Sequence, residues 1–369
     1  MTALILLASG GTGGHMFPAE ALAGALLARG YKVALVTDTR GRGFGDRLPD
    51  VSVHRISAGG LAGGGLVRRA QGILSLSLGF WQSRGLVSRL NPKLVVGFGG
   101  YASVPAVLAA QRADISTLVH EQNAVLGRAN RMLAPKARII ATSFADTKYL
   151  EKDRGRFTGN PVRAPIAAIG ERPYPEIGET LHILVTGGSQ GARVFSRLLP
   201  AAFAQLSPAH RQRLSLAQQC RPEDLEQVRA AYAPLGMQVE LATFFDNMAE
   251  RLGRAHLVIA RSGASTVAEL AAAGRPAILI PYPHAIDDHQ TANAIGFCGA
   301  GAGWLMPEAT VTAETIAERL RSILSFPVGL KTRAAAALHS GARDAALRLA
   351  DLVGELAPSN GIKPARVAA

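Results

Sequence analysis

The chain of 369 residues has little cysteine, few aromatic residues and no long hydrophobic run. Its two cysteines, Cys220 and Cys298, lie far apart and lack metal-ligand spacing, which excludes a disulfide-dense scaffold and fits a reducing cytoplasm. No apolar run approaches the length of about 18 residues that a spanning helix needs. The apolar start at Ala3 follows no basic residue and leads directly into a glycine turn, so it predicts a first strand rather than a signal peptide.

Acidic residues are also under-represented. Forty Lys and Arg residues against 27 Asp and Glu residues give a net charge of +13, which favours anionic partners such as nucleic acids, anionic membranes or phosphate-bearing substrates. The basic residues are spread along the chain and no DNA- or RNA-binding motif is present, so we expect no nucleic-acid partner.

Short apolar runs alternate with longer amphipathic ones, which is typical of α/β domains whose parallel sheets are covered by helices. We expect strands at 3–8, 32–37, 51–56, 94–97, 116–120, 138–142, 181–186, 214–218, 237–241, 256–260 and 276–280. We expect helices at 18–29, 66–90, 103–112, 126–133, 190–206, 222–233, 264–273, 288–297, 312–325 and 341–356.

A proline- and glycine-bearing segment from Gly159 to Gly178 interrupts this alternation and predicts an interdomain linker. The predicted organisation is an N-terminal domain over 1–160, a C-terminal domain over 161–340, a helix over 341–357 that packs back on the first domain, and a loose tail over 358–369.

Each predicted domain has a glycine-rich turn directly after its first strand: Ser9–His15 in the first and Gly187–Ala192 in the second. Such a turn exposes backbone N–H groups at a helix N-terminus, where they bind anions. One such turn is only a weak indication of a nucleotide site. Two turns, one at the start of each domain, favour two nucleotide-type domains that face each other across a cleft. The first turn does not have the dinucleotide spacing G-x-G-x-x-G. His15 could act as a general base or phosphate ligand, or could instead cap its helix.

Two further clusters are predicted at the same sheet edge of the first domain. Gly97–Pro105 follows a strand and could bind a pyrophosphate next to the first turn, or could simply be a tight loop. His120–Asn123 ends a strand with four polar groups. Glu121 could orient a base and Asn123 could bind a sugar hydroxyl, or both could serve as polar residues at a helix start.

In the second domain, Arg261–Glu269 opens a helix whose N–H groups suit a diphosphate. Glu269 could accept hydrogen bonds from ribose hydroxyls, or could be the acid of a capping box with Thr266. Pro281–Gln290 offers several polar groups. The spacing of Asp287, Asp288 and His289 does not match a metal site, so we expect no metal.

The segment Leu66–Arg89 interleaves apolar side chains with arginines. This pattern suits contact with an anionic membrane, although an ordinary buried helix face has the same apolar content.

Taken together, these motifs resemble the MurG family of peripheral membrane glycosyltransferases over nearly the whole chain. The matching segments, in the family's order, are Gly10–Pro18, Gly99–Pro105, His120–Asn123, Gly159–Arg163, Gly187–Ala192, Arg261–Glu269 and His289–Gln290. The resemblance implies a GT-B fold of two Rossmann-like domains separated by a cleft. It also implies inverting transfer of N-acetylglucosamine from UDP-N-acetylglucosamine to the muramyl C4 hydroxyl of the undecaprenyl-linked acceptor lipid I, giving lipid II without a cofactor or metal.

The resemblance also implies roles for individual residues. The base is His15, with Glu121 a weaker candidate. The donor is bound by Thr12, Gly13, Gly14, Asn123, Arg163, Ser189, Gln190, Gly191, Phe245, Ser262, Ala264, Glu269 and Gln290. The acceptor diphosphate is bound by Gly13, Gly14, Gly99, Gly100 and Tyr101. The membrane is contacted by Arg68, Arg69, Ile73, Leu76, Phe80 and Trp81. The implied location is the cytoplasmic face of the bacterial inner membrane, where other cell-wall synthesis proteins are potential partners.

The chain departs from the family pattern in three places. Val104 stands where glycine is expected, Gln218–Arg221 replaces a common His-Gln-Thr-Gly, and Asn247 replaces a common acid. Three rival functions remain open: a GT-B enzyme with a soluble acceptor, a UDP-sugar epimerase that needs no acceptor, and a nucleotide-binding module without catalysis.

Overall fold

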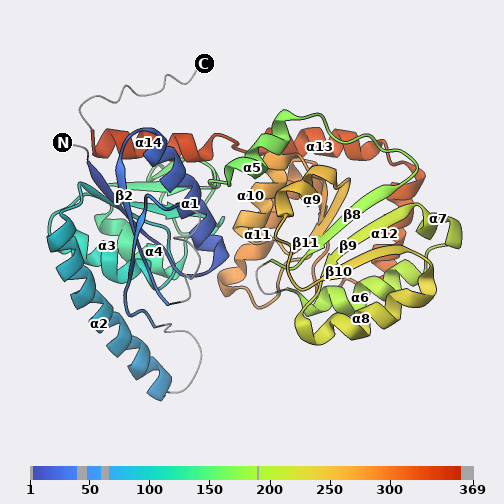
Figure 1. Cartoon of the computed structure of the whole chain (residues 1–369), viewed down its shortest axis with the longest axis horizontal. Helices are drawn as coiled ribbons and strands as arrows, with labels where there is room; N and C mark the ends of the chain where they lie inside the picture. The colour runs from blue at the N-terminus through green and yellow to red at the C-terminus, as the bar shows by residue number, and fades with distance from the viewer. Residues whose placement is uncertain (1–2, 40–47, 60–65, 189–190, 359–369) are drawn as a thin grey trace. The chain divides into compact units, whose positions relative to one another are not determined.

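The computed structural model describes residues 3–39, 48–59, 66–188 and 191–358 (Figure 1). The chain divides into two compact units. Unit 1 comprises Met1–Arg163 and Ala342–Ala369, and unit 2 comprises Ala164–Gly341. Each unit has its own sheet and hydrophobic core.

The sheet of unit 1 has seven strands in the order β3-β2-β1-β4-β5-β6-β7, and every pairing is parallel. The strands are β1 (Leu4–Ala8), β2 (Lys32–Thr37), β3 (Ser52–Arg55), β4 (Leu94–Gly97), β5 (Thr117–Glu121), β6 (Ile139–Thr142) and β7 (Gly155–Phe157). The order reverses between β1 and β4, which is where open α/β sheets bind ligands at the carboxyl ends of their strands.

Helices cover both faces of this sheet, because its strands are apolar on both sides. They are α1 (Gly13–Ala28), α2 (Leu66–Leu90), α3 (Ser103–Arg112), α4 (Arg128–Leu133), the 3₁₀ helix η1 (Ala134–Lys136) and α14 (Ala345–Leu356). One core cluster lies under α1 and α14, and a second lies under α2 and α3. The late helix α14 therefore completes the first unit (Figure 1). An ion pair between Arg29 and Asp351 at 2.7 Å joins it to the end of α1.

Unit 2 repeats the arrangement with six parallel strands in the order β10-β9-β8-β11-β12-β13. The strands are β8 (Leu181–Thr186), β9 (Leu214–Gln219), β10 (Gln238–Ala242), β11 (Leu257–Ala260), β12 (Ala277–Leu279) and β13 (Gly303–Leu305). Its helices are α5 (Ala164–Ala167), α6 (Arg193–Ala204), α7 (Pro208–Gln212), α8 (Leu225–Tyr232), α9 (Met248–Arg254), α10 (Ala264–Ala273), α11 (His289–Gly299), α12 (Ala313–Ser325) and α13 (Gly329–Ser340), with 3₁₀ turns η2 (Ala168–Glu171), η3 (Pro222–Asp224), η4 (Ala233–Leu235) and η5 (Ile286–Asp288). Side chains of α6, α8 and α12 form the main core of this unit with the sheet.

Most predicted elements are present, and three helices match their predicted bounds: α2, α3 and α10. The first helix begins at Gly13, five residues earlier than expected, because Thr12 is extended and ends the preceding turn, so Pro18 lies inside the helix. Six strands and α-helices of the described residues were not expected, namely β7, β13, α5, α7, α9 and α13; α5 lies in the segment predicted as a linker. The two strands have only three residues each, which is too short for a periodic pattern. The predicted tail lies outside the described residues from 359 onward.

Candidate active site

The two glycine turns of unit 1 meet beside His15. The Gly10 N–H donates to the Gly99 carbonyl oxygen at 3.2 Å. A Cβ on Gly100 would lie 3.1 Å from the Gly10 Cα and 3.2 Å from the His15 ring, and both Gly99 and Gly100 have φ near +75°. Glycine is therefore required by close approach and by backbone conformation. The predicted position of Gly97–Pro105 next to the first turn is confirmed by these contacts.

His15 is the third residue of α1, and its Nδ1 lies 3.2 Å from Oε1 of Gln122, just beyond the end of β5. The interacting pair lies 107 residues apart in sequence. Gln122 is buried, and its Nε2 donates to the Phe98 carbonyl oxygen at 2.9 Å and to Nδ1 of His120 at 3.1 Å. In the sequence, Gln122 is only one of four successive polar residues, and nothing there marks it as the partner of His15.

Glu121 is buried, and both of its carboxylate oxygens accept hydrogen bonds. Oε1 accepts from the backbone N–H and the side-chain amide of Asn123 at 2.9 and 3.2 Å. Oε2 accepts from the Gly127 N–H at 2.8 Å and from Nδ2 of Asn130 at 2.7 Å. A carboxylate held by four N–H groups is built to orient its neighbours, so the structure favours Glu121 as the group that orients Asn123 over its weaker candidacy as the base.

Arg163, a predicted donor ligand, stacks on the ring of Phe17 in α1. The guanidinium of Arg163 lies 4.2 Å from the ring centroid of Phe17. That ring lies against Gly13, where a Cβ would come within 3.1 Å of it. Thr12 occupies the N-cap position in an extended conformation, so α1 presents its first N–H groups next to Thr12, Gly13 and Gly14. Tyr101 follows the second glycine turn and is partly buried.

The glycine turn of unit 2 is organised by Gln219, the one residue of Gln218–Arg221 that keeps the family's His-Gln-Thr-Gly pattern. Its Oε1 accepts from the Thr186 hydroxyl at 3.0 Å and from the Gly187 N–H at 3.2 Å. A Cβ on Gly187 would lie 2.3 Å from the Ala192 nitrogen, and Gly191 has φ +68°. Ser189 and Gln190, both predicted donor ligands, lie outside the described residues.

A second group of predicted donor residues surrounds the start of α10. The Ser262 hydroxyl donates to the Gln290 carbonyl oxygen at 2.8 Å, and the Gln290 side chain accepts from the Tyr282 N–H at 3.0 Å. Ala264 is the first residue of α10, which places its N–H at the helix terminus. Glu269 is the sixth residue of this helix and its N-cap is Gly263, so the capping-box alternative for Glu269 does not apply.

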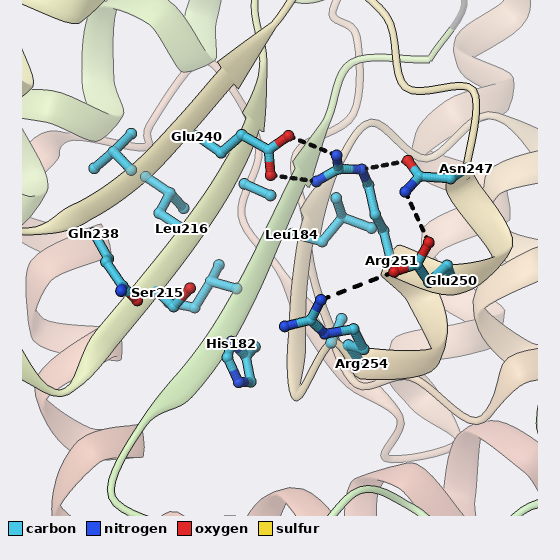
Figure 2. Close-up of a pocket in the computed structure, with 14 residues that line it drawn as sticks. His182, Leu184, Ser215, Leu216, Gln238, Glu240, Asn247, Glu250, Arg251 and Arg254 are labelled. Atoms are coloured by element: carbon cyan, nitrogen blue, oxygen red, sulfur yellow. Dashed lines mark hydrogen bonds and ion pairs between the residues drawn. The ribbon is translucent and has the colours of Figure 1, made fainter.

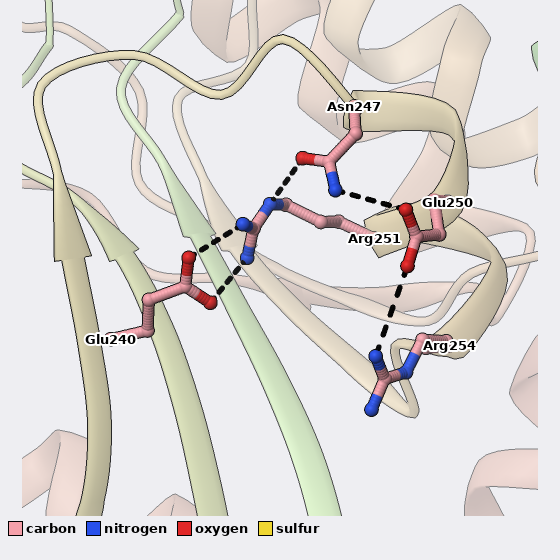
Figure 3. Close-up of polar contacts among 5 residues, drawn as sticks. All are labelled: Glu240, Asn247, Glu250, Arg251 and Arg254. Carbon is pink, nitrogen blue, oxygen red and sulfur yellow. Dashed lines mark hydrogen bonds and ion pairs between the residues drawn. The ribbon is translucent and has the colours of Figure 1, made fainter.

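Phe245 is buried beneath the guanidinium of Arg251, which lies 3.9 Å from its ring centroid. Figure 3 shows how this guanidinium is held: it forms two bonds with Glu240 at 2.6 and 2.7 Å, and its Nε donates to Oδ1 of Asn247 at 2.8 Å. Asn247 in turn donates to Glu250 at 3.0 Å. The amide that replaces an acid thus joins two charged groups, because it can accept and donate at once.

Glu240, Asn247, Glu250 and Arg251 form one wall of a cavity of about 310 Å³ between α9 and the strands β8, β9 and β10 (Figure 2). Its remaining lining includes His182, Ser215 and Gln238. None of the described residues predicted to bind the donor lines this cavity.

Helix α2 carries the predicted membrane contact. Its exposed apolar side chains are Ile73, Leu74, Leu78 and Trp81, with exposed fractions of 58, 72, 52 and 63%. Phe80 is partly buried and packs against the core, and Leu76 is also partly buried, so neither belongs to the most exposed part of this face. The side chains of Arg68 and Arg69 lie outside the described part of the helix.

Among the described residues, no helix is both long enough and apolar enough to cross a membrane. In the same part of the chain, no three His, Cys, Asp or Glu side chains gather closely enough to hold a metal ion.

Two Rossmann-like sheets, with glycine turns at the carboxyl ends of their first strands, define the class of the protein. The N-terminal domain model of glycosyltransferase family 28 matches residues 5–142, and the C-terminal domain model of that family matches residues 182–349. The chain therefore belongs to glycosyltransferase family 28 and is a glycosyltransferase with the GT-B fold.

Within this class, the chain is similar to one kind of enzyme. A Rhodospirillum rubrum protein is 55% identical over 351 residues, covering 95% of this chain and 91% of the relative. A Rhodospirillum centenum protein is 56% identical over 354 residues, covering 95 and 93%. Both are named UDP-N-acetylglucosamine–N-acetylmuramyl-(pentapeptide) pyrophosphoryl-undecaprenol N-acetylglucosamine transferase.

The comparison with solved structures also finds a MurG enzyme, together with proteins that share only the fold. The crystal structure of Acinetobacter baumannii MurG matches with a TM-score of 0.76 at 29% identity, covering 96% of this chain and 99% of that one. A UDP-N-acetylglucosamine 2-epimerase matches with a TM-score of 0.68 at 14% identity, covering 96% of each chain, and shares the fold alone.

Proposed function

We propose that this protein transfers N-acetylglucosamine from UDP-N-acetylglucosamine to the C4 hydroxyl of the muramyl sugar of lipid I, giving lipid II and UDP. The observation that carries this proposal is the similarity, over 95% of the chain, to relatives named for that transfer. In unit 1, the turns that contain Gly10 and Gly99–Gly100 meet beside His15, which supports the proposal. The site there combines anion-binding backbone N–H groups with a side chain that can accept a proton.

The proposed reaction is a single inverting displacement. The muramyl hydroxyl attacks the anomeric carbon, its proton passes to the His15 imidazole, and the bond to the UDP oxygen breaks with inversion. A single displacement needs only one base. Glu121 is not required as a second one, and its carboxylate oxygens accept hydrogen bonds from Asn123, Gly127 and Asn130. The negative charge on UDP would be stabilised by helix N-termini and by Arg163.

In this scheme unit 2 binds the donor. Glu269 would bind the ribose, Phe245 would lie at the uracil and Gln290 at the sugar. Ser262 and Ala264 would serve the diphosphate at the start of α10. Ser189, Gln190 and Gly191 would act at the first turn of this unit.

Unit 1 binds the acceptor in this scheme, with Gly13, Gly14, Gly99, Gly100 and Tyr101 at its diphosphate. The exposed apolar face of α2 would contact the anionic surface of the inner membrane from its cytoplasmic side, where the acceptor's lipid tail remains. The net charge of +13 supports this contact.

The test is UDP release from UDP-N-acetylglucosamine, with and without a short-chain lipid I analogue in detergent. We expect release to depend on the analogue and a disaccharide to form. Epimerisation or release without the analogue would instead indicate an epimerase or a hydrolase, and the acceptor assignments would be withdrawn.

The His15→Gln variant should lose most of its kcat while it still binds UDP.

A further inference from the structure

We propose that Gln122 positions His15 for catalysis by holding the imidazole hydrogen on Nδ1, with His120 and the Phe98 carbonyl oxygen fixing the direction of the Gln122 amide. The inference rests on the proposed role of His15 as the general base. It adds the side chains of Gln122 and His120, which act on that base through hydrogen bonds.

The direction of the Gln122 amide follows from its backbone partner. The carbonyl oxygen of Phe98 can only accept, so the Gln122 atom 2.9 Å from it must be the nitrogen. The reversed amide would place two oxygens against each other inside the buried site. Oε1 of Gln122 therefore faces His15.

His120 fixes the same direction independently. Its Nε2 lies 3.1 Å from the Gly159 carbonyl oxygen, so that nitrogen carries the hydrogen and donates. Burial lowers the pKa of His120 to about 4, so the ring is neutral near pH 7 and its Nδ1 has a lone pair. That lone pair accepts from the Gln122 amide nitrogen at 3.1 Å, which again leaves Oε1 toward His15.

The tautomer of His15 is the consequence. Because Oε1 of Gln122 accepts, the His15 Nδ1 at 3.2 Å must donate and must carry the hydrogen. In a neutral ring, the lone pair then lies on Nε2, the nitrogen that takes the acceptor's proton in the proposed step. When the imidazolium forms, Nδ1 keeps its hydrogen and its bond to Gln122, so the ring stays oriented.

A neutral amide suits this position. A carboxylate facing Nδ1 would also fix the tautomer, but it would add negative charge beside Gly99 and Gly100, which are expected to bind a diphosphate. The structure gives the nearby carboxylate, Glu121, other partners.

The first experiment measures the tautomer directly by ¹⁵N NMR of histidine-labelled full-length protein at pH 8, with the His15 signals assigned from the His15→Gln variant. We expect the hydrogen on Nδ1 in the wild type. A wild type with the hydrogen on Nε2 overturns the proposal, whatever the variants do.

The second experiment compares three variants. Gln122→Met keeps the side-chain length but has no acceptor oxygen, so we expect loss of the fixed tautomer and a kcat reduced roughly 10- to 100-fold with little change in the donor KM. Gln122→Glu in its protonated form donates its O–H to the Phe98 carbonyl oxygen and turns its other oxygen to His15, so it should restore the Nδ1 hydrogen and part of the kcat. Gln111→Met is the control, because Gln111 donates to the Leu133 carbonyl oxygen and to Thr117 within the same unit.

The outcomes separate this inference from the function it rests on. If Gln122→Met loses no more activity than Gln111→Met, the positioning role is overturned. If the tautomer responds as expected but His15→Gln keeps full activity, the tautomer assignment stands, and His15 is not the base.

Discussion

Buried polar side chains in unit 1 show how single residues shape the site. His120 is fully buried, and burial lowers its pKa to about 4, although its bond to the Gly159 carbonyl oxygen opposes that shift. The neutral ring accepts from Gln122, whereas a protonated ring could not. The site therefore depends on His120 staying uncharged.

The stability of the protein should accordingly fall in acid because of His120. The native ring binds its proton only near pH 4, whereas the unfolded chain binds it near pH 6.5, so stability is lost as pH falls between these values. From pH 7 to pH 5 the loss from this group is roughly 2 kcal/mol. Urea unfolding at both pH values should show a smaller loss for His120→Phe than for the wild type. Equal losses would mean that His120 does not contribute.

Glu121 should be important mainly for stability. Its removal in Glu121→Ala leaves the Gly127 N–H and the Asn130 amide without their acceptor inside the protein, which should cost about 2–3 kcal/mol. Glu121→Gln keeps one oxygen and should cost less. Urea unfolding measures both. A Glu121→Ala protein with unchanged stability but no turnover would instead assign the carboxylate to the chemistry.

At the scale of elements, helix α2 has one side against the unit and another exposed. Gly79 lies where the helix comes closest to the preceding segment, since a Cβ there would be only 2.0 Å from the Ser57 carbonyl oxygen. Gly85, six residues later, is exposed and has open space around it. The two glycines thus have opposite environments in one helix.

Alanine at these positions should have opposite effects. Gly79→Ala forces the helix away from Ser57 and should destabilise the protein by about 2 kcal/mol or more. Gly85→Ala should stabilise it by about 0.5–1 kcal/mol, because alanine favours the helix and nothing obstructs its Cβ. Thermal or urea unfolding of the pair is the measurement. Similar effects at both positions would contradict the close packing of α2.

The exposed face of α2 should bind membranes. Replacing Leu74, Leu78 and Trp81 with serine should reduce sedimentation with anionic vesicles at least 10-fold, with unchanged folding and activity on a short-chain acceptor in detergent. Phe80→Ser is the contrasting control, since Phe80 packs on the core and its loss should destabilise the protein. Undiminished vesicle binding by the triple variant would place the membrane contact elsewhere.

At the scale of the whole molecule, the two units have separate sheets and separate cores. A ligand that binds unit 2 should therefore protect that unit first. UDP at about 100 times its Kd should stabilise its unit by about 2.7 kcal/mol. Hydrogen exchange should slow in β8 and β11 and change less in β1 and β4. Unchanged exchange in β8 and β11 would contradict donor binding by unit 2.

The sequence by itself determined that the chain repeats an α/β scheme, because strand and helix periodicity and glycine turns are local features. It also located α2, α3 and α10 within their observed bounds, since each has a long or clearly bounded pattern. It drew attention to His15, because a histidine directly after a glycine turn is visible in the letters.

Only the tertiary structure decided which side chains serve His15. Gln122 rather than Glu121 faces it, because neighbouring residues at the end of β5 point to different sides, and the contact joins residues 107 positions apart. The same holds for Gln219 at the second glycine turn and for Arg251 over Phe245. Such partners come from other elements, and local periodicity carries no information about the packing that brings them together.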